Sequence, residues 1–462
     1  MPASPTPPDA APAKSRPAKT PAPTPASDAP PTVPAPSSPA GGGARLQWLD
    51  ALRGLAALVV VFEHSLDVLF PEIRRGVSPW FDFGRYGVFV FFIVSGYIVP
   101  ASLERRGSVR EFWIGRMFRL YPLWAVAAVV GLGLGLAKAG WDPPGDLTAK
   151  PWTSALAHLT MLQDLLGVPN ALNVFWTLSY EMVFYLLVTA MFVAGVHRAS
   201  ALTAVLLAAA AAAFGALLPT TLLAAHSRAG TIAAAALLMA GGLVAVMSGN
   251  RVVRRCGVAV LGVLALGLVT LNHRVGGVES LAIIATMFAG SGIYRIQKGQ
   301  TPRWPGIAAV VAVPVLTLAG GAYLALTEQR LPYGATGDWG WPAAVAAAWL
   351  TFALGMLLRN RRMPPFLPWL GVISYSVYLL HSPVVQIIWR ITDEPDRITV
   401  PVRLLWMVVL ISAVLVVGAL AHRHIELPMQ RAGRRLIRRR RARAAAADEF
   451  PARAESLSPG PT

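Results

Sequence analysis

The sequence predicts an all-α protein that crosses a membrane about 10 to 12 times and begins with a disordered arm. The chain is 55% hydrophobic and only 14% charged, and its mean hydropathy of +0.53 is too high for a soluble protein of 462 residues. Up to twelve apolar runs approach the ~20 residues that a helix needs to span a bilayer. The basic residues lie between and beyond these runs.

The apolar runs begin at Leu49 and follow one another along most of the chain. They cover residues 49–70, 83–103, 119–139, 174–196, 201–222, 229–248, 252–271, 278–296, 306–327, 342–359, 370–391 and 402–422. The Ala-rich runs between 201 and 271 also fit a hairpin or a re-entrant pair, so 10 or 11 spans remain open. Residues 151–166 are predicted to form an amphipathic helix on the outer membrane surface.

The net charge of +18 is distributed as the positive-inside rule requires. Arginine and lysine gather in alternate loops, whereas the loops between them hold one to three such residues each. This pattern places both termini in the cytoplasm of a multi-pass plasma-membrane protein. It also favours an anionic lipid bilayer as the partner of the basic residues, and argues against nucleic acid.

Three segments are expected along the chain. Residues 1–44 contain 14 of the 38 prolines, a composition typical of a disordered cytoplasmic arm. Residues 45–430 form the membrane domain, and residues 431–462 are expected to be a disordered, basic cytoplasmic tail. The single cysteine, Cys256, excludes an intrachain disulfide.

Arg53 and His64 are ionisable residues inside the first apolar run. Their eleven-residue spacing places them on one helix face, about 16 Å apart along the axis. In the structural interpretation, Arg53 extends to the interface beside Asp50 and His64 bonds a neighbouring helix. In the functional interpretation, a cationic anchor near the cytoplasm and an imidazole in the outer half hold a long substrate along the helix.

Arg116 and Arg119 are three positions apart at the start of the third run and therefore share a helix face. Their planar guanidinium groups suit phosphate, although positive-inside charge alone also explains them. Glu181 lies about eight residues into an apolar span, where a carboxylate needs a partner. Tyr185 lies one turn below Glu181, and Trp176 lies above it as a cavity wall or an interface residue.

Two further motifs combine small, aromatic and polar residues. Ser95 is a candidate acyl-accepting nucleophile, but helix packing beside Gly87 and Gly96 explains it better. Tyr378 and His381 lie near one face of the eleventh run. A second histidine at a depth similar to that of His64 favours a polar cavity between these helices.

Taken in order, these stretches resemble the acyltransferase-3 family of integral-membrane acyltransferases over residues 47–430. Six short motifs carry the resemblance: LDALRGLA at 49–56 with His64, GVFVFFIVSGYIV at 87–99, Arg116 with Arg119, WTLSYEMVFY at 176–185, ISYSVYLLHSP at 373–383, and Ile425, Glu426 and Pro428. Ala51 replaces the usual glycine, and Tyr180 replaces a small aliphatic residue.

The resemblance implies transfer of an acyl group, acetyl by default, from cytoplasmic acyl-CoA to a hydroxyl group. The acceptor is a cell-surface or secreted carbohydrate, a glycolipid or a macrolide-type compound. Acyl-CoA is then a donor substrate, and neither a tightly bound cofactor nor a metal is implied.

The resemblance also implies roles for the candidate residues. His64 is the general base. Arg53, Arg116 and Arg119 bind the CoA phosphates. Glu181 orients His64 or binds the acceptor. Weaker substrate-binding candidates are Tyr185, Trp176, Tyr378 and His381.

One other mechanism and two other functions stay open from the sequence. Transfer through an acyl-His or acyl-Ser95 intermediate ranks second to direct transfer. A glycolipid or sugar transporter, or a non-catalytic scaffold, also accommodates intramembrane ionisable residues.

Overall fold

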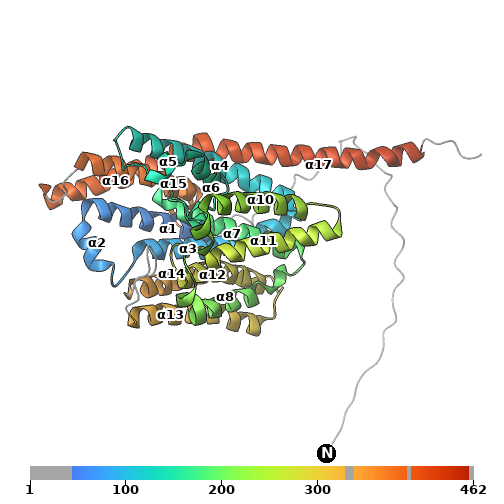
Figure 1. Ribbon diagram of the computed structural model, residues 1–462, viewed down its shortest axis with the longest axis horizontal. Helices are drawn as coiled ribbons and strands as arrows, with labels where there is room; N and C mark the ends of the chain where they lie inside the picture. The colour runs from blue at the N-terminus through green and yellow to red at the C-terminus, as the bar shows by residue number, and fades with distance from the viewer. Residues whose placement is uncertain (1–43, 328–337, 393–396, 457–462) are drawn as a thin grey trace, which may run out of the picture. The chain divides into compact units, whose positions relative to one another are not determined.

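The computed structural model describes residues 44–327, 338–392 and 397–456. The predicted arm, apart from its last residue, lies outside these ranges. The described residues form helices and contain no strand, which confirms the all-α prediction (Figure 1). The long helices are α1 (Ala44–Leu69), α3 (Phe83–Arg106), α4 (Val109–Leu136), α7 (Trp176–Val193), α8 (Ser200–Phe214), α10 (Arg228–Val246), α11 (Arg251–Leu271), α12 (Gly277–Gln297), α13 (Arg303–Leu326), α14 (Gly340–Leu357), α15 (Phe366–Thr392), α16 (Val400–Ala421) and α17 (Leu427–Ser456).

Short helices connect several of these elements. They are α2 (Pro71–Val77), α5 (Gly145–Ala149), α6 (Pro151–Leu159), η1 (Gln163–Leu166), η2 (Asn173–Phe175), η3 (His197–Ala199), η4 (Gly215–Leu217), α9 (Leu222–His226) and the π-helical turn η6 (His422–Glu426). The predicted surface helix 151–166 is divided into α6 and η1. Met161 adopts a φ of 56° between them, and the chain then turns so that Leu162, Leu165 and Leu166 are buried.

Each of the twelve predicted apolar runs coincides largely with helical residues, and most of them extend one to a few residues past a helix end. Within the described residues, eleven helices are long and apolar enough to cross a membrane. α1 is not among them, although it has 26 residues, because Asp50, Arg53, Glu63 and Asp67 interrupt its apolar sequence. The Ala-rich region forms three separate long helices, α8, α10 and α11, rather than a short hairpin. The chain is therefore a multi-pass membrane protein.

The connecting segments gather at two ends of the helix bundle. At the α2 end, Arg274 forms an ion pair with Asp164 at 3.2 Å, and Arg403 pairs with Glu72 at 2.8 Å. At the opposite end, which we call the α17 end, Arg295 pairs with Glu104 at 2.6 Å. Loops that alternate along the chain thus meet at the same end, as the sequence predicts for helices that cross in alternating directions.

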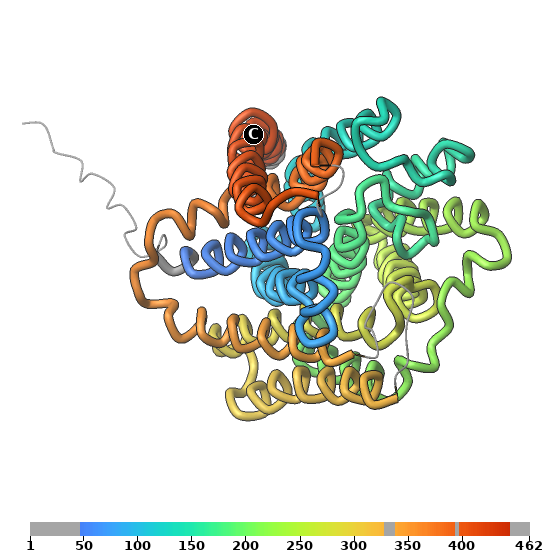
Figure 2. The backbone as a smooth tube through the Cα atoms, turned by 90° about the vertical axis from the view of Figure 1, so that its left-hand side faces the viewer, coloured from blue at the N-terminus to red at the C-terminus, as the bar shows by residue number. Residues whose placement is uncertain are grey.

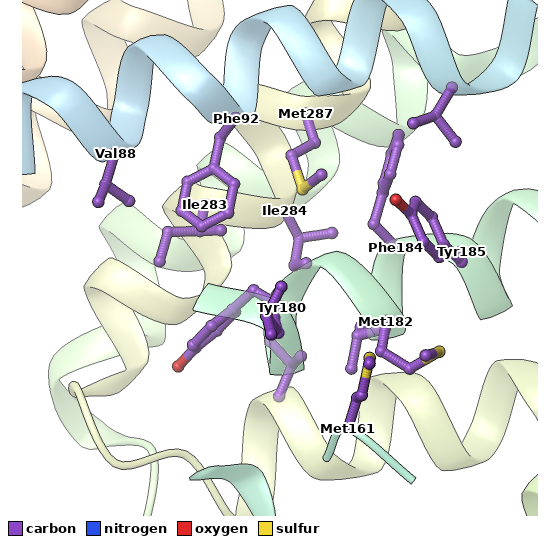
Figure 3. Packing of buried hydrophobic residues seen from close by; sticks show 14 of the residues in the cluster. Val88, Phe92, Met161, Tyr180, Met182, Phe184, Tyr185, Ile283, Ile284 and Met287 are labelled. Carbon is purple, nitrogen blue, oxygen red and sulfur yellow. The ribbon is translucent and has the colours of Figure 1, made fainter. Parts of the chain in front are cut away.

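The centre of the bundle is α12, whose residues from Gly277 to Arg295 are all buried. It crosses α3 closely, since a Cβ atom at Gly96 would lie 1.9 Å from the Met287 carbonyl oxygen. Ser291 donates a hydrogen bond of 2.9 Å to the Gly96 carbonyl at this crossing. Figure 3 shows side chains of α3, α7 and α12 filling the surrounding space, among them Phe92, Phe184 and Ile284. The predicted packing role of Gly96 is confirmed.

α1 is enclosed by α3 and α15, and Figure 2 shows the blue α1 and α3 side by side in the interior. Small residues on both neighbours allow this. A Cβ atom at Gly371 of α15 would lie 1.9 Å from the Asp50 carbonyl oxygen, and one at Gly87 of α3 would lie 2.8 Å from the Ala56 carbonyl oxygen.

The basic tail differs from the expectation of disorder, because its described residues belong to helix α17. Alanine and arginine are good helix formers, and α16 continues into α17 through η6 without a break. α17 packs against α4, where Arg441 donates a hydrogen bond of 2.6 Å from Nε to Glu111.

The loop between α11 and α12 is tied to the α2 end by buried polar groups. Asn272 donates a hydrogen bond of 2.6 Å to the Leu165 carbonyl and accepts one of 2.9 Å from the Ala224 amide. The neighbouring His273 is fully buried, and both of its ring nitrogens lack a hydrogen-bond partner in the described structure. Burial therefore lowers the pKa of His273 to about 4.

We predict that Gly96→Ala destabilises the protein by about 1–3 kcal/mol, because the added methyl group forces α3 away from α12. The measurement is the thermal unfolding midpoint of the detergent-solubilised protein. Gly262→Ala in α11 is the control, since a Cβ atom there meets no atom within 4 Å. Equal midpoints for the two variants would contradict the close crossing.

We also predict that acid destabilises the protein through His273. Between pH 6.5 and 4 the unfolded histidine binds a proton that the folded one does not, so the free energy of unfolding falls as the pH falls. At pH 5 the loss is about 2 kcal/mol relative to neutral pH. Unfolding midpoints at pH 7 and pH 5 should therefore differ less for His273→Gln than for the wild type. The exposed His226 is the matched control, and an unchanged pH dependence in His273→Gln would refute the prediction.

Candidate active site

A cavity lies inside the bundle between α1, α3, α4, α7 and α15, and its empty volume, including space open to solvent, is about 740 Å³. Along α3 it extends from Val88 to Val99, about 16 Å of helix axis. Its polar lining consists of Arg53, Ser95, Arg116, Arg119, Thr177, Glu181, Tyr375 and Tyr378. The remaining lining residues are aliphatic or phenylalanine. We call this the arginine cavity.

The three predicted phosphate-binding arginines meet in this cavity. Arg53 comes from α1, whereas Arg116 and Arg119 come from successive turns of α4. Among the described residues, neither Arg53 nor Arg119 has a hydrogen-bond or ion-pair partner, although Asp50, Glu181 and Glu426 act on Arg53 over longer distances. Two cationic groups without a direct partner make the cavity suitable for an anion.

Arg116 is held differently from the other two arginines. It is buried, donates a hydrogen bond of 3.3 Å to the Tyr185 hydroxyl, and stacks over the Tyr185 ring at 5.0 Å. Tyr185 in turn donates a hydrogen bond to Glu181. Glu181 and Tyr185 therefore belong with the arginines, and their contacts fix the position of the Arg116 guanidinium.

His64 lies next to the arginine cavity rather than in its wall. Its Nδ1 is 3.1 Å from an Asp67 carboxylate oxygen, and Asp67 lies 3.3 Å from Nε of Arg74. The expectation that Glu181 orients the imidazole is therefore not matched by the contacts, because Glu181 bonds Tyr185 and Asp67 occupies Nδ1. The i,i+3 spacing of His64 and Asp67 on one helix is a sequence signal for this pair.

A row of three rings connects His64 with the cavity. The His64 ring stacks on His381 at a centroid distance of 5.2 Å, and His381 lies 5.9 Å from the Tyr378 ring, which lines the cavity. His381 is fully buried, and its Nε2 has no hydrogen-bond partner in the described part of the chain. The two histidines thus lie at the same depth, as the sequence predicts.

Tyr378 closes the arginine cavity toward the α2 end. Its hydroxyl lies 2.9 Å from the Thr177 hydroxyl and donates a hydrogen bond of 3.1 Å to the Val174 carbonyl. Thr177 was not singled out from the sequence, because its role depends on a contact between residues 201 positions apart.

Trp176 lies outside the arginine cavity. The Arg85 guanidinium stacks on its ring at 4.8 Å, and the Tyr180 ring packs against it at 5.8 Å. Arg85 also pairs with the buried Glu279 at 2.6 Å. These contacts favour a structural role for Trp176 over the substrate-binding role that the sequence suggested. Ser95 does line the cavity, so the alternative nucleophile lies near the arginines.

Residues 46–422 match the acyltransferase-3 family, which is described as an acyltransferase domain. The chain belongs to this family, and the resemblance found in the sequence is confirmed. The match includes all the residues that line the arginine cavity together with His64, Asp67 and His381. Family membership favours an acyltransferase over a transporter.

Several characterised proteins are similar to part of this chain. Acyltransferase MdmB of Streptomyces mycarofaciens is 30% identical over 149 residues, 31% of this chain and 38% of the relative. Nodulation protein 10 of Rhizobium leguminosarum bv. viciae is 30% identical over 153 residues, 30% of this chain and 41% of the relative. Peptidoglycan O-acetyltransferase OatA of Listeria monocytogenes is 28% identical over 155 residues, 30% of this chain and 23% of the relative.

The chain thus spans less than half the length of the curated relatives it matches. No solved structure matches it significantly.

Proposed function

We propose that this protein is a membrane O-acyltransferase that transfers an acyl group, acetyl by default, from acyl-CoA to a hydroxyl group of a carbohydrate, glycolipid or related acceptor. The observation that carries the proposal is the arginine cavity. Arg53 and Arg119 have no direct partner there within the described part of the chain, and a row of rings leads from the cavity to His64. Membership of an acyltransferase family supports the same reaction.

The cavity suits the two chemical halves of acyl-CoA. The phosphates are anionic and pair with guanidinium groups through charge-assisted hydrogen bonds. The acyl-pantetheine arm is long and thin, and the α3 lining between Val99 and Val88, which is apolar apart from Ser95, offers it about 16 Å of path. The arginines lie on the half of α4 nearer the α17 end, so the donor enters from that end.

The reaction uses His64 as the base. When Nδ1–H donates a hydrogen bond to Asp67 and keeps its proton, Nε2 is left to accept the proton of the acceptor hydroxyl. The hydroxyl oxygen then forms a bond to the thioester carbonyl carbon, and the C–S bond breaks. The leaving thiolate takes the proton from the imidazolium, which yields the ester and free CoA. Tyr378 must move for this step, since its ring and that of His381 lie between the cavity and His64.

The same proposal orients the protein in the plasma membrane. The α17 end carries the arginine-rich loops, and both helix α17 and the start of α1 lie there. Cytoplasmic termini therefore place the donor opening on the side where CoA is made.

We predict that Arg119→Gln raises the KM for acetyl-CoA about 10- to 100-fold, the loss expected for one charge-assisted hydrogen bond. The measurement is CoA release by the protein reconstituted in vesicles. Arg119→Lys should recover part of the loss. Arg361→Gln is the control, because Arg361 is an exposed arginine outside the cavity. An unchanged KM in Arg119→Gln would exclude the proposed donor site.

We predict that His64→Ala lowers acceptor-dependent CoA release by about 10² to 10⁴ and leaves acetyl-CoA binding unchanged. Asp67→Asn should lower kcat less, without changing the KM for the donor, and should alter the pH dependence of kcat. The measurement is steady-state turnover between pH 5.5 and 9.

Three results would revise this mechanism. Full turnover in His64→Ala would exclude His64 as the base. A burst of CoA without an acceptor would favour an acyl-enzyme, with Ser95 as a candidate. Wild-type protein that releases no CoA with any of several acyl-CoAs and glycans would favour the transporter.

A further inference from the structure

A second cavity opens at the α2 end and has an empty volume of about 660 Å³. One wall is the end of α4, and another is formed by residues 141–144 and 169–173. Arg274 and Gln386 complete the lining. We call this the α2-end cleft.

The cleft carries neutral amide side chains that are held in place by hydrogen bonds to neighbouring groups of the protein. Gln386 of α15 is buried and accepts a hydrogen bond of 3.4 Å from the Trp141 amide. Asn170 donates a hydrogen bond of 2.8 Å to Asp164 and accepts one of 2.9 Å from Gln163. Amide side chains offer both donors and acceptors, as sugar hydroxyl groups do.

The charge of the cleft differs from that of the arginine cavity. Among the described residues, its one lining cation is Arg274, which pairs with the buried Asp164 at 3.2 Å. Asp142 adds a negative charge to the lining. Burial raises the pKa of Asp164, although Arg274 and the Asn170 amide oppose this shift. A phosphorylated donor is therefore favoured in the arginine cavity and a neutral ligand in the cleft.

An aromatic ring lies beside these amides. Trp141 is 39% exposed and packs edge-on against Trp389 at 6.3 Å. One face of the cleft thus presents a large amphipathic ring that is fixed by a second one. Rigid aromatic rings next to a few convergent polar groups are typical of small-molecule sites.

The cleft and the arginine cavity share two walls. On α15, Tyr378 lines the cavity and Gln386 lines the cleft, about 12 Å apart along the helix. On the other side, Asn173 lines the cleft and Thr177 lines the cavity. Between them stands the contact of Tyr378 with Thr177 and Val174.

We propose that the α2-end cleft binds the acceptor as a neutral oligosaccharide, and that the Tyr378–Thr177 contact is the partition through which an acceptor hydroxyl meets the donor. This inference rests on the proposed acyl-transfer function and adds the place where the acceptor binds. The oligosaccharide stacks on Trp141 and bonds the amides of Asn173 and Gln386.

The experiment compares exposed cleft residues with a matched tryptophan outside the cleft. Trp141→Ala and Asn173→Ala replace exposed side chains, so both variants are expected to fold. Trp152→Ala is the control, because Trp152 is 86% exposed on α6 and does not line the cleft. The assays are acetyl transfer to chitotetraose and maltotetraose, and binding of both by saturation-transfer NMR, with the reconstituted protein.

The expected result is a KM for the tetrasaccharide about tenfold higher in Trp141→Ala and Asn173→Ala, with the KM for acetyl-CoA unchanged. Trp141→Phe should retain part of the affinity, and Trp152→Ala should match the wild type. Thr177→Val should change kcat more than it changes the KM for the tetrasaccharide or the KM for acetyl-CoA. The reason is that this substitution alters the partition and not the cleft.

If both cleft variants kept the wild-type KM for the tetrasaccharide while Arg119→Gln lost donor binding, the cleft would not be the acceptor site. The proposed acyl-transfer function would remain intact. A wild-type protein that uses no acyl-CoA would overturn the proposed function. Even then, loss of tetrasaccharide binding in Trp141→Ala would support the cleft as an oligosaccharide site. Failure of the wild type to bind or acetylate either tetrasaccharide would overturn the assignment of a neutral oligosaccharide.

Discussion

The ionisable residues of α1 cannot face hydrocarbon at an acceptable cost, and this constraint determines where the helix lies. Glycines on its neighbours allow α1 to be enclosed: Gly371 of α15 meets the Asp50 backbone, and Gly84 of α3 lies against the Glu63 carboxylate. Glu63 pairs with Arg74, and Asp67 pairs with His64. The charged face of α1 is thus turned into protein, where it forms part of one cavity and holds one histidine in place.

The capacity of the arginine cavity to bind an anion depends on which of its arginines already have a partner within the protein. Arg116 is fixed through Tyr185 and Glu181, whereas neither Arg53 nor Arg119 has a hydrogen-bond or ion-pair partner among the residues that the structure describes. A guanidinium fixed within the protein loses little freedom when an anion binds, and an unpaired one supplies the attraction. The rest of the described lining holds one carboxylate, neutral polar side chains and apolar residues, so the positive charge is confined to one region of the cavity.

Tyr378 links the two cavities. Its ring contacts His381, its hydroxyl bonds the segment that begins α7, and its helix carries Gln386 into the α2-end cleft. In the proposed reaction, donor and acceptor bind on opposite sides of this side chain, which would keep water and thioester apart until both substrates are present. The stacked pair of His64 and His381 lies beside Tyr378, where the proposed mechanism requires proton transfer.

The sequence by itself determined the features that depend on local periodicity. Apolar runs of near-constant length predicted the long helices, the three-residue spacing predicted that Arg116 and Arg119 share a face, and Gly96 signalled close packing. Disorder of the tail was predicted from its charge, yet helix propensity and contact with α4 make its described residues helical. Only the tertiary structure decided that Arg53 joins two arginines more than sixty positions away, that Asp67 rather than Glu181 holds His64, and that Tyr378 meets Thr177. These contacts depend on the register between helices, which is set by the packing of many side chains together and leaves no signal within one helix.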